Sequence, residues 1–357
     1  MVVRWAAALI AFLIVAFVGV LVVGNFGGDA AAAANSWALV GALGLAFAFV
    51  AYAAVEYGQT GGFASIASQF DMRTLVLMPI AIAVNIILGA AVANALKIPI
   101  YLDSIGTILV GALAGPIPGA ITGFLANILW QYVIPPPFQG TVAAPFAIVA
   151  AVIGLMAGLF ARARWLRPRP NSSGQALIIG GLIAVAVVVL LGIYAYSRFY
   201  ADAFEFFNPD TENLLFVILG WLIAALFVAF LIGFVGLLII RRDLAVAYVT
   251  VAGVLTGVVA ALISAPISAN LFSGVTGSGT DFLVAAFRQA GSDIQAATFQ
   301  QGLLSDPVDK LVTFFVVYLV LTAMATRTIA RFPQGERLID AGDEALEDAE
   351  EWRGASA

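Results

Sequence analysis

The side chains that could do chemistry in this chain are carboxylates, amides and hydroxyls. The sequence contains neither cysteine nor histidine, which excludes disulfides, thiol nucleophiles, imidazole bases and the usual zinc and haem ligands. No nucleotide-binding P-loop motif occurs. Asp306-Pro307-Val308-Asp309 is the nearest approach to a cluster of acids, and we expect it at a helix start, where carboxylates are favoured without any catalytic role. The sequence therefore predicts a binding protein without a cofactor, and not an enzyme.

Polar residues that could bind a ligand gather around the stretch from Tyr101 to Gln131. Two short apolar segments, 105–113 and 119–132, meet at Gly-Pro-Ile-Pro-Gly, where prolines and glycines end one helix and begin another. Glycine recurs at every fourth position from 111 to 123, which lets a neighbouring helix approach closely. We expect a tight helical hairpin with arms that cover only about 20–23 Å of an apolar core near 30 Å. Such short helices line enclosed cavities; a kinked packing hairpin without a ligand is the alternative.

A second stretch, from Ser264 to Lys310, is rich in glycine and hydroxyl residues. Its backbone amides could meet a small ligand, since glycine allows close approach. The segment from Phe282 to Ala297 has helical character and is expected to lie across the mouth of the site as a cap. Lys310 follows Asp306 by four residues, a spacing that favours either an ordinary helical ion pair or a ligand contact.

Together the two stretches predict one outer cavity in which a ring would stack on Trp130. Asn85, a polar residue within a span, is either a ligand group or an interhelical hydrogen bond. Asp103 either contacts the ligand or caps the helix expected to begin at Ser104. The carboxylate-rich mouth favours a neutral or cationic ligand, such as a thiamine-like or pyridine-like compound. The candidate substrate-binding residues are Asn85, Tyr101, Asp103, Ser104, Thr107, Asn127, Trp130, Gln131, Asn270, Thr276, Asp281 and Lys310.

The composition places these residues in a lipid bilayer. With 62% hydrophobic and 10% charged residues, a soluble fold would have too little polar surface to cover itself. We expect an all-α, polytopic integral membrane bundle, because no strand-like alternation suggests a barrel. It has ten crossings if both hairpin arms span and eight if the hairpin is re-entrant. The expected spans are 5–23, 37–55, 75–95, the two hairpin arms 105–113 and 119–132, then 143–161, 176–195, 214–240, 244–263 and 308–325.

The distribution of basic residues predicts that both termini lie in the cytoplasm. Of the 16 lysines and arginines, this orientation puts 12 in the cytoplasm and four outside it, at Lys97, Arg198, Arg288 and Lys310. Such an excess of basic residues is typical of cytoplasmic loops. The first span is either an uncleaved anchor or a cleaved signal peptide; its length of about 19 apolar residues favours the anchor, since signal h-regions run to about 7–15.

Four segments carry a resemblance to a known family: IAIAVNIILGA, IPIYLDSIGTILVGALAGPIPGAITGFLANILW, FSGVTGSGTDFLVAAF and SDPVDKLVTFFVVYLV. They resemble the S component, the substrate-capturing membrane subunit of an energy-coupling factor (ECF) transporter. The resemblance covers residues 74–163 and 244–331 and implies a compact core of six helices. Residues 1–60 then form a two-helix N-terminal addition, 175–240 a two-helix insertion, and 332–357 an acidic cytoplasmic tail.

The resemblance implies uptake of a vitamin or related micronutrient across the plasma membrane of a prokaryote. Its partners would be a transmembrane coupling subunit and two ABC ATPases, with no nucleic acid. Family members dock on the coupling subunit through an Ala-x-x-x-Ala motif on their first helix. In this chain Ala81 is followed four residues on by Asn85, a departure from that motif, whereas Ala91 and Ala95 fit the spacing nearer the outer end.

Other classes of function stay open. Some receptor kinases carry similar hairpins, so a membrane sensory module with a separate signalling partner is the alternative; an output domain would be expected after Ala330, where 27 residues remain. A membrane enzyme would need clustered acids or a nucleophile with a base. A self-sufficient secondary transporter would need charged residues deep in its spans, and these are scarce.

Overall fold

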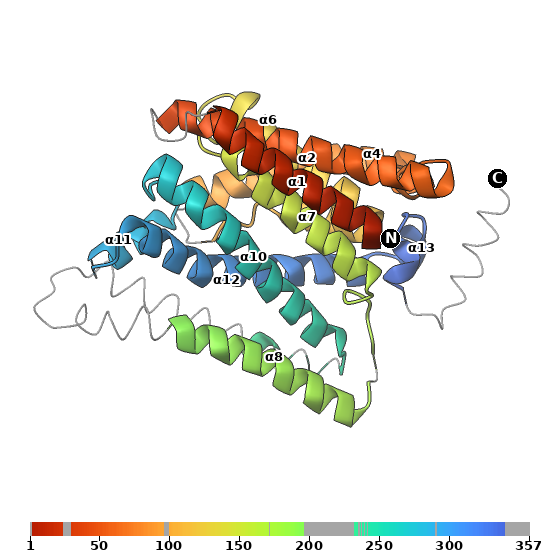
Figure 1. Cartoon of the computed structure of the whole chain (residues 1–357). Coiled ribbons are helices and arrows are strands. Elements are labelled where there is room, and N and C mark those ends of the chain that lie inside the picture. Colours follow the sequence, from red (N-terminus) through yellow and green to blue (C-terminus); the bar gives the residue numbers. More distant parts are fainter. Residues whose placement is uncertain are drawn as a thin grey trace, which may run out of the picture.

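The computed structural model describes residues 2–23, 30–95, 100–170, 172–195, 232–234, 236, 238, 240, 242–289 and 291–339. Every regular element within these ranges is a helix (Figure 1). The elements are α1 (Val2–Val23), α2 (Ala30–Thr60), α3 (Ala64–Ala67), α4 (Met72–Gly89), the π-helix η1 (Ala90–Ala95), α5 (Ile105–Ala114), α6 (Pro116–Tyr132), the 3₁₀ helix η2 (Ala144–Phe146), α7 (Ala147–Arg162), α8 (Gly174–Ala195), α10 (Ala245–Phe272), α11 (Asp281–Gln289), α12 (Ile294–Ala323), α13 (Thr326–Ala330) and the 3₁₀ helix η4 (Gly335–Arg337).

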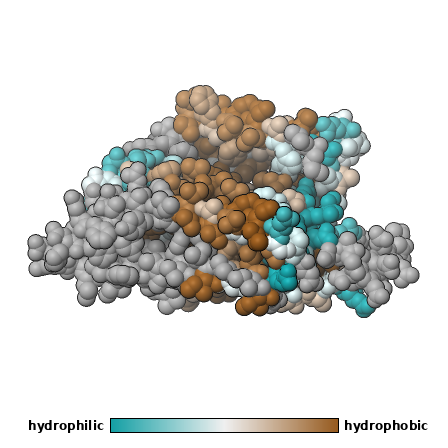
Figure 2. Space-filling model, turned by 90° about the horizontal axis from the view of Figure 1, so that it is seen from below, coloured by the Kyte–Doolittle hydropathy of each residue, from teal (hydrophilic) through white to brown (hydrophobic). Residues whose placement is uncertain are grey.

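Five of the described helices are long and apolar enough to cross a membrane: α1, α2, α4, α7 and α10. Two shorter apolar helices, α5 and the first part of α8, add to them. The space-filling view in Figure 2 shows a hydrophobic surface across the middle of the molecule, with hydrophilic residues on either side of it. The prediction of an all-α membrane protein is thereby confirmed in its general form.

The hairpin of α5 and α6 packs tightly against α7 because glycines remove the side chains between them. A Cβ atom on Gly154 would lie 2.2 Å from the Gly119 carbonyl oxygen, and one on Gly123 would lie 2.3 Å from that of Ala150. Gly115, between the two arms, has a φ of 134°, a conformation that favours glycine. Gly111, Gly119 and Gly123 thus allow the close approach of a neighbouring helix that the sequence predicted. Gly115 faces the side chain of Gln69 instead.

Helix α4 lies against α5 in a similarly close contact. A Cβ atom on Gly106 would lie 2.2 Å from the Ala81 carbonyl oxygen. One turn further along α4, the Asn85 amide donates to Thr107 Oγ1 at 2.7 Å, and its oxygen accepts from the Gly106 N–H at 2.7 Å. The buried Asn85 side chain therefore joins α4 to the first turn of α5.

Helices α10 and α12 are longer than the spans expected from the sequence, and they pack on each other where glycine meets proline. Helix α10 continues to Phe272 and not to 263, and α12 begins at Ile294 and not at 308. A Cβ atom on Gly257 would lie 2.3 Å from the Pro307 Cα. The expectation that Asp306 to Asp309 starts a helix was wrong, because Pro307 lies inside α12. The missing N–H of a proline is the signal that suggested a helix boundary, but a helix can continue past a proline.

Basic residues meet at the end of the bundle where α7 finishes. Arg4 pairs with the buried Glu56 at 3.2 Å, Arg73 donates to the Arg331 carbonyl at 3.0 Å, and Arg162 donates to Gln334 at 3.0 Å. Figure 1 shows the start of α1 at the same end as α13. These arginines belong to the group that the sequence assigns to the cytoplasm, and the structure brings them together.

Gln334 closes this end of the hairpin. Its backbone N–H donates to the Leu113 carbonyl at 2.8 Å, and its side-chain amide donates to the Gly111 carbonyl at 3.0 Å. Carbonyls in the last turn of a helix have no partner within the helix. The segment after α13 therefore supplies hydrogen-bond donors to carbonyls in the last turn of α5.

Helices α1, α2 and α8 belong to the parts of the chain outside the expected six-helix core. Helices α1 and α2 pack on each other, and α2 also contacts α7 and η2. Helix α8 contacts α10, below which it runs in Figure 1. Residues 197–213 of the predicted insertion, most of the expected span 214–240, Lys97 and the acidic segment 340–357 lie outside the described residues.

Candidate ligand-binding cavity

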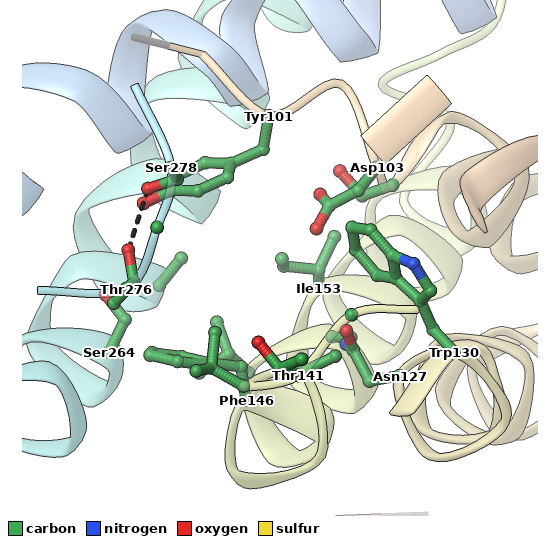
Figure 3. Close-up of a pocket in the computed structure, with 18 of the residues that line it drawn as sticks. Tyr101, Asp103, Asn127, Trp130, Thr141, Phe146, Ile153, Ser264, Thr276 and Ser278 are labelled. Atoms are coloured by element: carbon green, nitrogen blue, oxygen red, sulfur yellow. Dashed lines mark hydrogen bonds between the residues drawn. The ribbon is translucent and has the colours of Figure 1, made fainter. Parts of the chain in front are cut away.

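A cavity of about 280 Å³ lies at the end of α7 opposite the arginines. Its walls come from the segment before α5, the last turns of α6, the chain from 137 to 146, the first turns of α7, and residues of α10, the 276–278 loop and α12. Figure 3 shows Asp103 and Trp130 on one side of the cavity, with Ser264 and Thr276 on the other. The volume lies near the lower end of the roughly 300–1,000 Å³ typical of small-molecule pockets.

The segment before α5 is fixed by α12 and by the loop after α10. Asp309 Oδ1 accepts the N–H groups of Tyr101 and Leu102, at 3.0 and 2.8 Å. The Tyr101 hydroxyl lies 2.7 Å from Thr280 Oγ1. Burial raises the pKa of the Tyr101 phenol, so this wall presents a neutral hydroxyl. Residues about 180 and 208 positions apart thus build one wall.

Lys310 makes two hydrogen bonds and a longer ion pair. Its ammonium lies 2.5 Å from Asp309 Oδ2, 2.8 Å from Ser104 Oγ and 3.6 Å from Asp103 Oδ1. Of the two alternatives for Lys310, the ion pair with Asp306 is not formed: the short contact is with the adjacent Asp309, and Asp306 accepts from hydroxyls instead. The four-residue spacing allowed a pair with Asp306, but the fold places the Asp309 carboxylate nearest to the ammonium.

Asp103 contributes a carboxylate at the cavity and does not cap α5. Helix α5 begins at Ile105, and its N-cap residue is Ser104, with no side-chain capping hydrogen bond. Burial raises the pKa of Asp103, and the neighbouring Lys310 opposes that effect. Its side chain retains 27% of its exposure, which leaves it accessible from the cavity.

Asp306 is a second carboxylate at the cavity wall. The residue is 6% exposed, and its oxygens accept hydrogen bonds from Ser264 at 3.0 Å and from Ser305 at 3.3 Å. Among the residues that the structure describes, no cation lies within ion-pair distance of it. Hydroxyl donors stabilise a carboxylate less than a cation does.

Aromatic rings complete the lining. The Trp130 indole N–H donates to the Phe138 carbonyl at 2.8 Å, which fixes the ring. Gly140 and Gly89 pack directly on it, since a Cβ atom on either would lie within 3 Å of indole atoms. Phe146 stacks on Phe272 with centroids 6.0 Å apart, joining α10 to the start of α7. The cavity is thus bounded by rings held in place from behind.

Seven of the twelve candidate residues line this cavity, and five lie elsewhere. Those that line it are Tyr101, Asp103, Ser104, Asn127, Trp130, Thr276 and Lys310. Those that do not are Asn85, Thr107, Gln131, Asn270 and Asp281.

The five residues outside the lining make contacts that hold the fold together. Asn85 and Thr107 bond to each other between α4 and α5. Gln131 accepts from the Ala144 N–H, and Asn270 from Gln295, at 2.6 and 2.7 Å. Asp281 accepts from the N–H groups of Thr276 and Gly277 and so shapes the loop that reaches the cavity.

The expected cap also has a different position. Helix α11 covers Asp281–Gln289 and packs on α12 through an apolar cluster that includes Leu283, Phe287 and Leu304. None of its residues lines the cavity. The nine-residue helix is amphipathic, and its apolar face is used against α12.

Several lining residues were not among the candidates. They are Pro137, Gln139, Gly140, Thr141, Val142, Ala143, Phe146, Val149, Ala150, Ile153, Gly277, Ala260, Ser264, Ser278 and Asp306. The chain after α6 folds back because the Gly140 N–H donates to the Trp130 carbonyl at 3.2 Å. The run Pro135-Pro136-Pro137 marks a turn in the sequence, but no pattern shows which way the chain turns.

No protein-family model, curated protein or solved structure matches this chain.

Proposed function

We propose that this protein is the substrate-capturing membrane subunit of an ECF-type importer and binds a vitamin or related micronutrient from outside. The observation that carries the proposal is the cavity itself. It is walled by residues from both blocks that resemble S components, 74–163 and 244–331, and it combines fixed aromatic rings with a few polar groups. Such a lining is typical of small-molecule sites.

The position of the cavity supports capture from one side of the membrane. It lies by the first turns of α7, whereas the arginines assigned to the cytoplasm lie by its last turn. A helix of 16 residues separates the two by about 24 Å. With the orientation that the basic residues predict, the cavity faces outward.

The proposal needs partners, because the chain carries no ATP-binding motif. A transmembrane coupling subunit and two ABC ATPases would supply energy, and the ligand would be released inward when the complex forms. The face of α4 that carries Ala81 packs on Gly106, so docking would use another surface. Exposed residues on α4 such as Leu75, Ile80 and Ile87 offer one.

The test compares binding with transport. The isolated protein in detergent is expected to bind the micronutrient saturably, and proteoliposomes that contain it alone are expected not to take the compound up. Addition of the coupling subunit and ATPases should give ATP-dependent uptake. Uptake by the protein alone would identify a secondary transporter instead, and failure of the complex to form would contradict the proposal.

A further inference from the structure

The charged groups at the cavity do not balance. Three carboxylates, Asp103, Asp306 and Asp309, stand against one ammonium, that of Lys310. Asp309 lies behind the wall and is fully used, since one oxygen accepts two backbone N–H groups and the other accepts Lys310. When all four groups are ionised, the site has an excess of two negative charges.

Lys310 is poorly placed to hold an anionic ligand. An ammonium has three N–H donors; this one donates hydrogen bonds to Asp309 and Ser104, and Asp103 lies at ion-pair distance, 3.6 Å away. The residue is 4% exposed. A ligand carboxylate or phosphate would have to compete with Asp309 and Asp103 for this ammonium and would add a further negative charge beside them, which is unfavourable.

Asp306 and Asp103 are the groups that a ligand can satisfy. Asp306 lines the cavity, and within the described part of the chain its hydrogen-bond partners are the hydroxyls of Ser264 and Ser305. Asp103 shares Lys310 with the much closer Asp309. A positive charge between them would favour the ionised form of both carboxylates and form charge-assisted hydrogen bonds.

The remaining walls suit an organic body and not a bare ion. Trp130 and Phe146 border the cavity, and Asp103 lies beside Trp130 in Figure 3. An indole face attracts cations through its quadrupole. Within the described residues, no three acidic side chains are grouped as a metal ion would require.

We propose that the ligand is an organic cation, with an ammonium, amidinium or pyridinium nitrogen directed to Asp306 and Asp103 and an apolar or aromatic body against Trp130 and Phe146. This inference rests on the proposed function, because it specifies the class of compound that the subunit captures. It narrows the neutral or cationic ligand expected from the sequence to the cationic one.

The test uses three soluble probes that share a phenol ring and differ in charge: tyramine, a cation; tyrosol, which is neutral; and 4-hydroxyphenylacetate, an anion. Their dissociation constants for the full chain in detergent are measured by isothermal titration calorimetry at pH 7.5. We expect tyramine to bind at least about 10-fold more tightly than tyrosol, with the anion weakest. Equal binding of the three, tighter binding of the anion, or no binding of tyramine would overturn the inference.

Variants assign the preference to the carboxylates. Asp306→Asn keeps the shape and acceptor of the side chain, and Asp103→Asn does so at the second site; each is expected to reduce the preference for tyramine about 10-fold. Asp293→Asn is the matched control, because Asp293 caps α12 away from the cavity and asparagine caps equally well. Retention of the preference in both cavity variants would overturn the assignment.

Failure of the inference can be told from failure of the proposed function. A neutral or anionic compound that binds and is taken up with the coupling partners would overturn the cation and leave the uptake function standing. A cation that binds but is not transported with those partners would leave the cation inference standing and overturn the uptake function.

Discussion

At the scale of single residues, two asparagines distinguish a contact between helices from a position at the cavity. Asn85 is 2% exposed and bonds Thr107 and Gly106, whereas Asn127 lines the cavity. Asn85→Ala is expected to lower the free energy of unfolding by about 1–3 kcal/mol, since it leaves a buried N–H and hydroxyl unpaired. Asn127→Ala should weaken binding of the co-purified ligand with little change in thermal stability.

The two variants would be compared by thermal unfolding in detergent and by ligand titration. A stable Asn85→Ala protein with lost binding would show that the amide acts on the ligand after all. Such an outcome would require the cavity to extend to α4, which contributes no residue to the lining.

Lys310 provides the second prediction at this scale. Lys310→Met leaves Asp309 buried without its cation, and removal of one partner of a buried pair costs about 3–5 kcal/mol. The double change Lys310→Met with Asp309→Asn should recover much of that loss, because asparagine still offers an oxygen to the N–H groups of Tyr101 and Leu102. Thermal unfolding of the three proteins measures this; equal losses in the single and double variants would contradict it.

At the scale of elements, close helix packing makes a prediction about glycine. Gly154→Ala would place a Cβ atom 2.2 Å from the Gly119 carbonyl oxygen and push α6 away from α7, so a loss of about 1–3 kcal/mol is expected. Gly174→Ala is the control, because nothing lies within 4 Å of that position at the start of α8. Comparable unfolding temperatures for the two variants would contradict the tight α6–α7 contact.

Much of this helical framework could be predicted from the sequence, since it follows from local rules. The first arm of the hairpin ends and the second begins at prolines, which lack N–H donors. The spacing of Gly111, Gly119 and Gly123 indicates the packed face. The true ends of α10 and α12 could not be predicted. Pro266 and Pro307 resemble boundaries in sequence, yet both lie inside helices because tertiary packing overrides the local signal.

The site was predictable only in part, for a related reason. Residues near the hairpin entry and exit were identified because polar groups at the ends of short spans stand out. The partner of Lys310 and the roles of Asp306 and Ser264 depend on how α10 and α12 face each other. The backfolded chain from 137 to 143 depends on hydrogen bonds such as Trp130 to Phe138, which leave no mark in the sequence.

At the scale of the whole molecule, sidedness can be measured directly. The chain has no cysteine, so each introduced thiol is unique. Val275→Cys, at an exposed position beside the cavity, should react with a membrane-impermeant maleimide on intact cells. Ser68→Cys, beside the Arg4 contacts, should react only after lysis. The opposite pattern would invert the orientation and place the cavity on the cytoplasmic side.

The central claim is that the cavity captures a small molecule from outside, and it is tested most directly by mass spectrometry of what co-purifies with the native protein. We predict one micronutrient-like compound, retained by Asp293→Asn and lost in Trp130→Ala, because Trp130 walls the cavity and Asp293 does not. A preparation that contains no such compound and instead carries a signalling protein, with no micronutrient uptake, would contradict the claim and favour a sensory module.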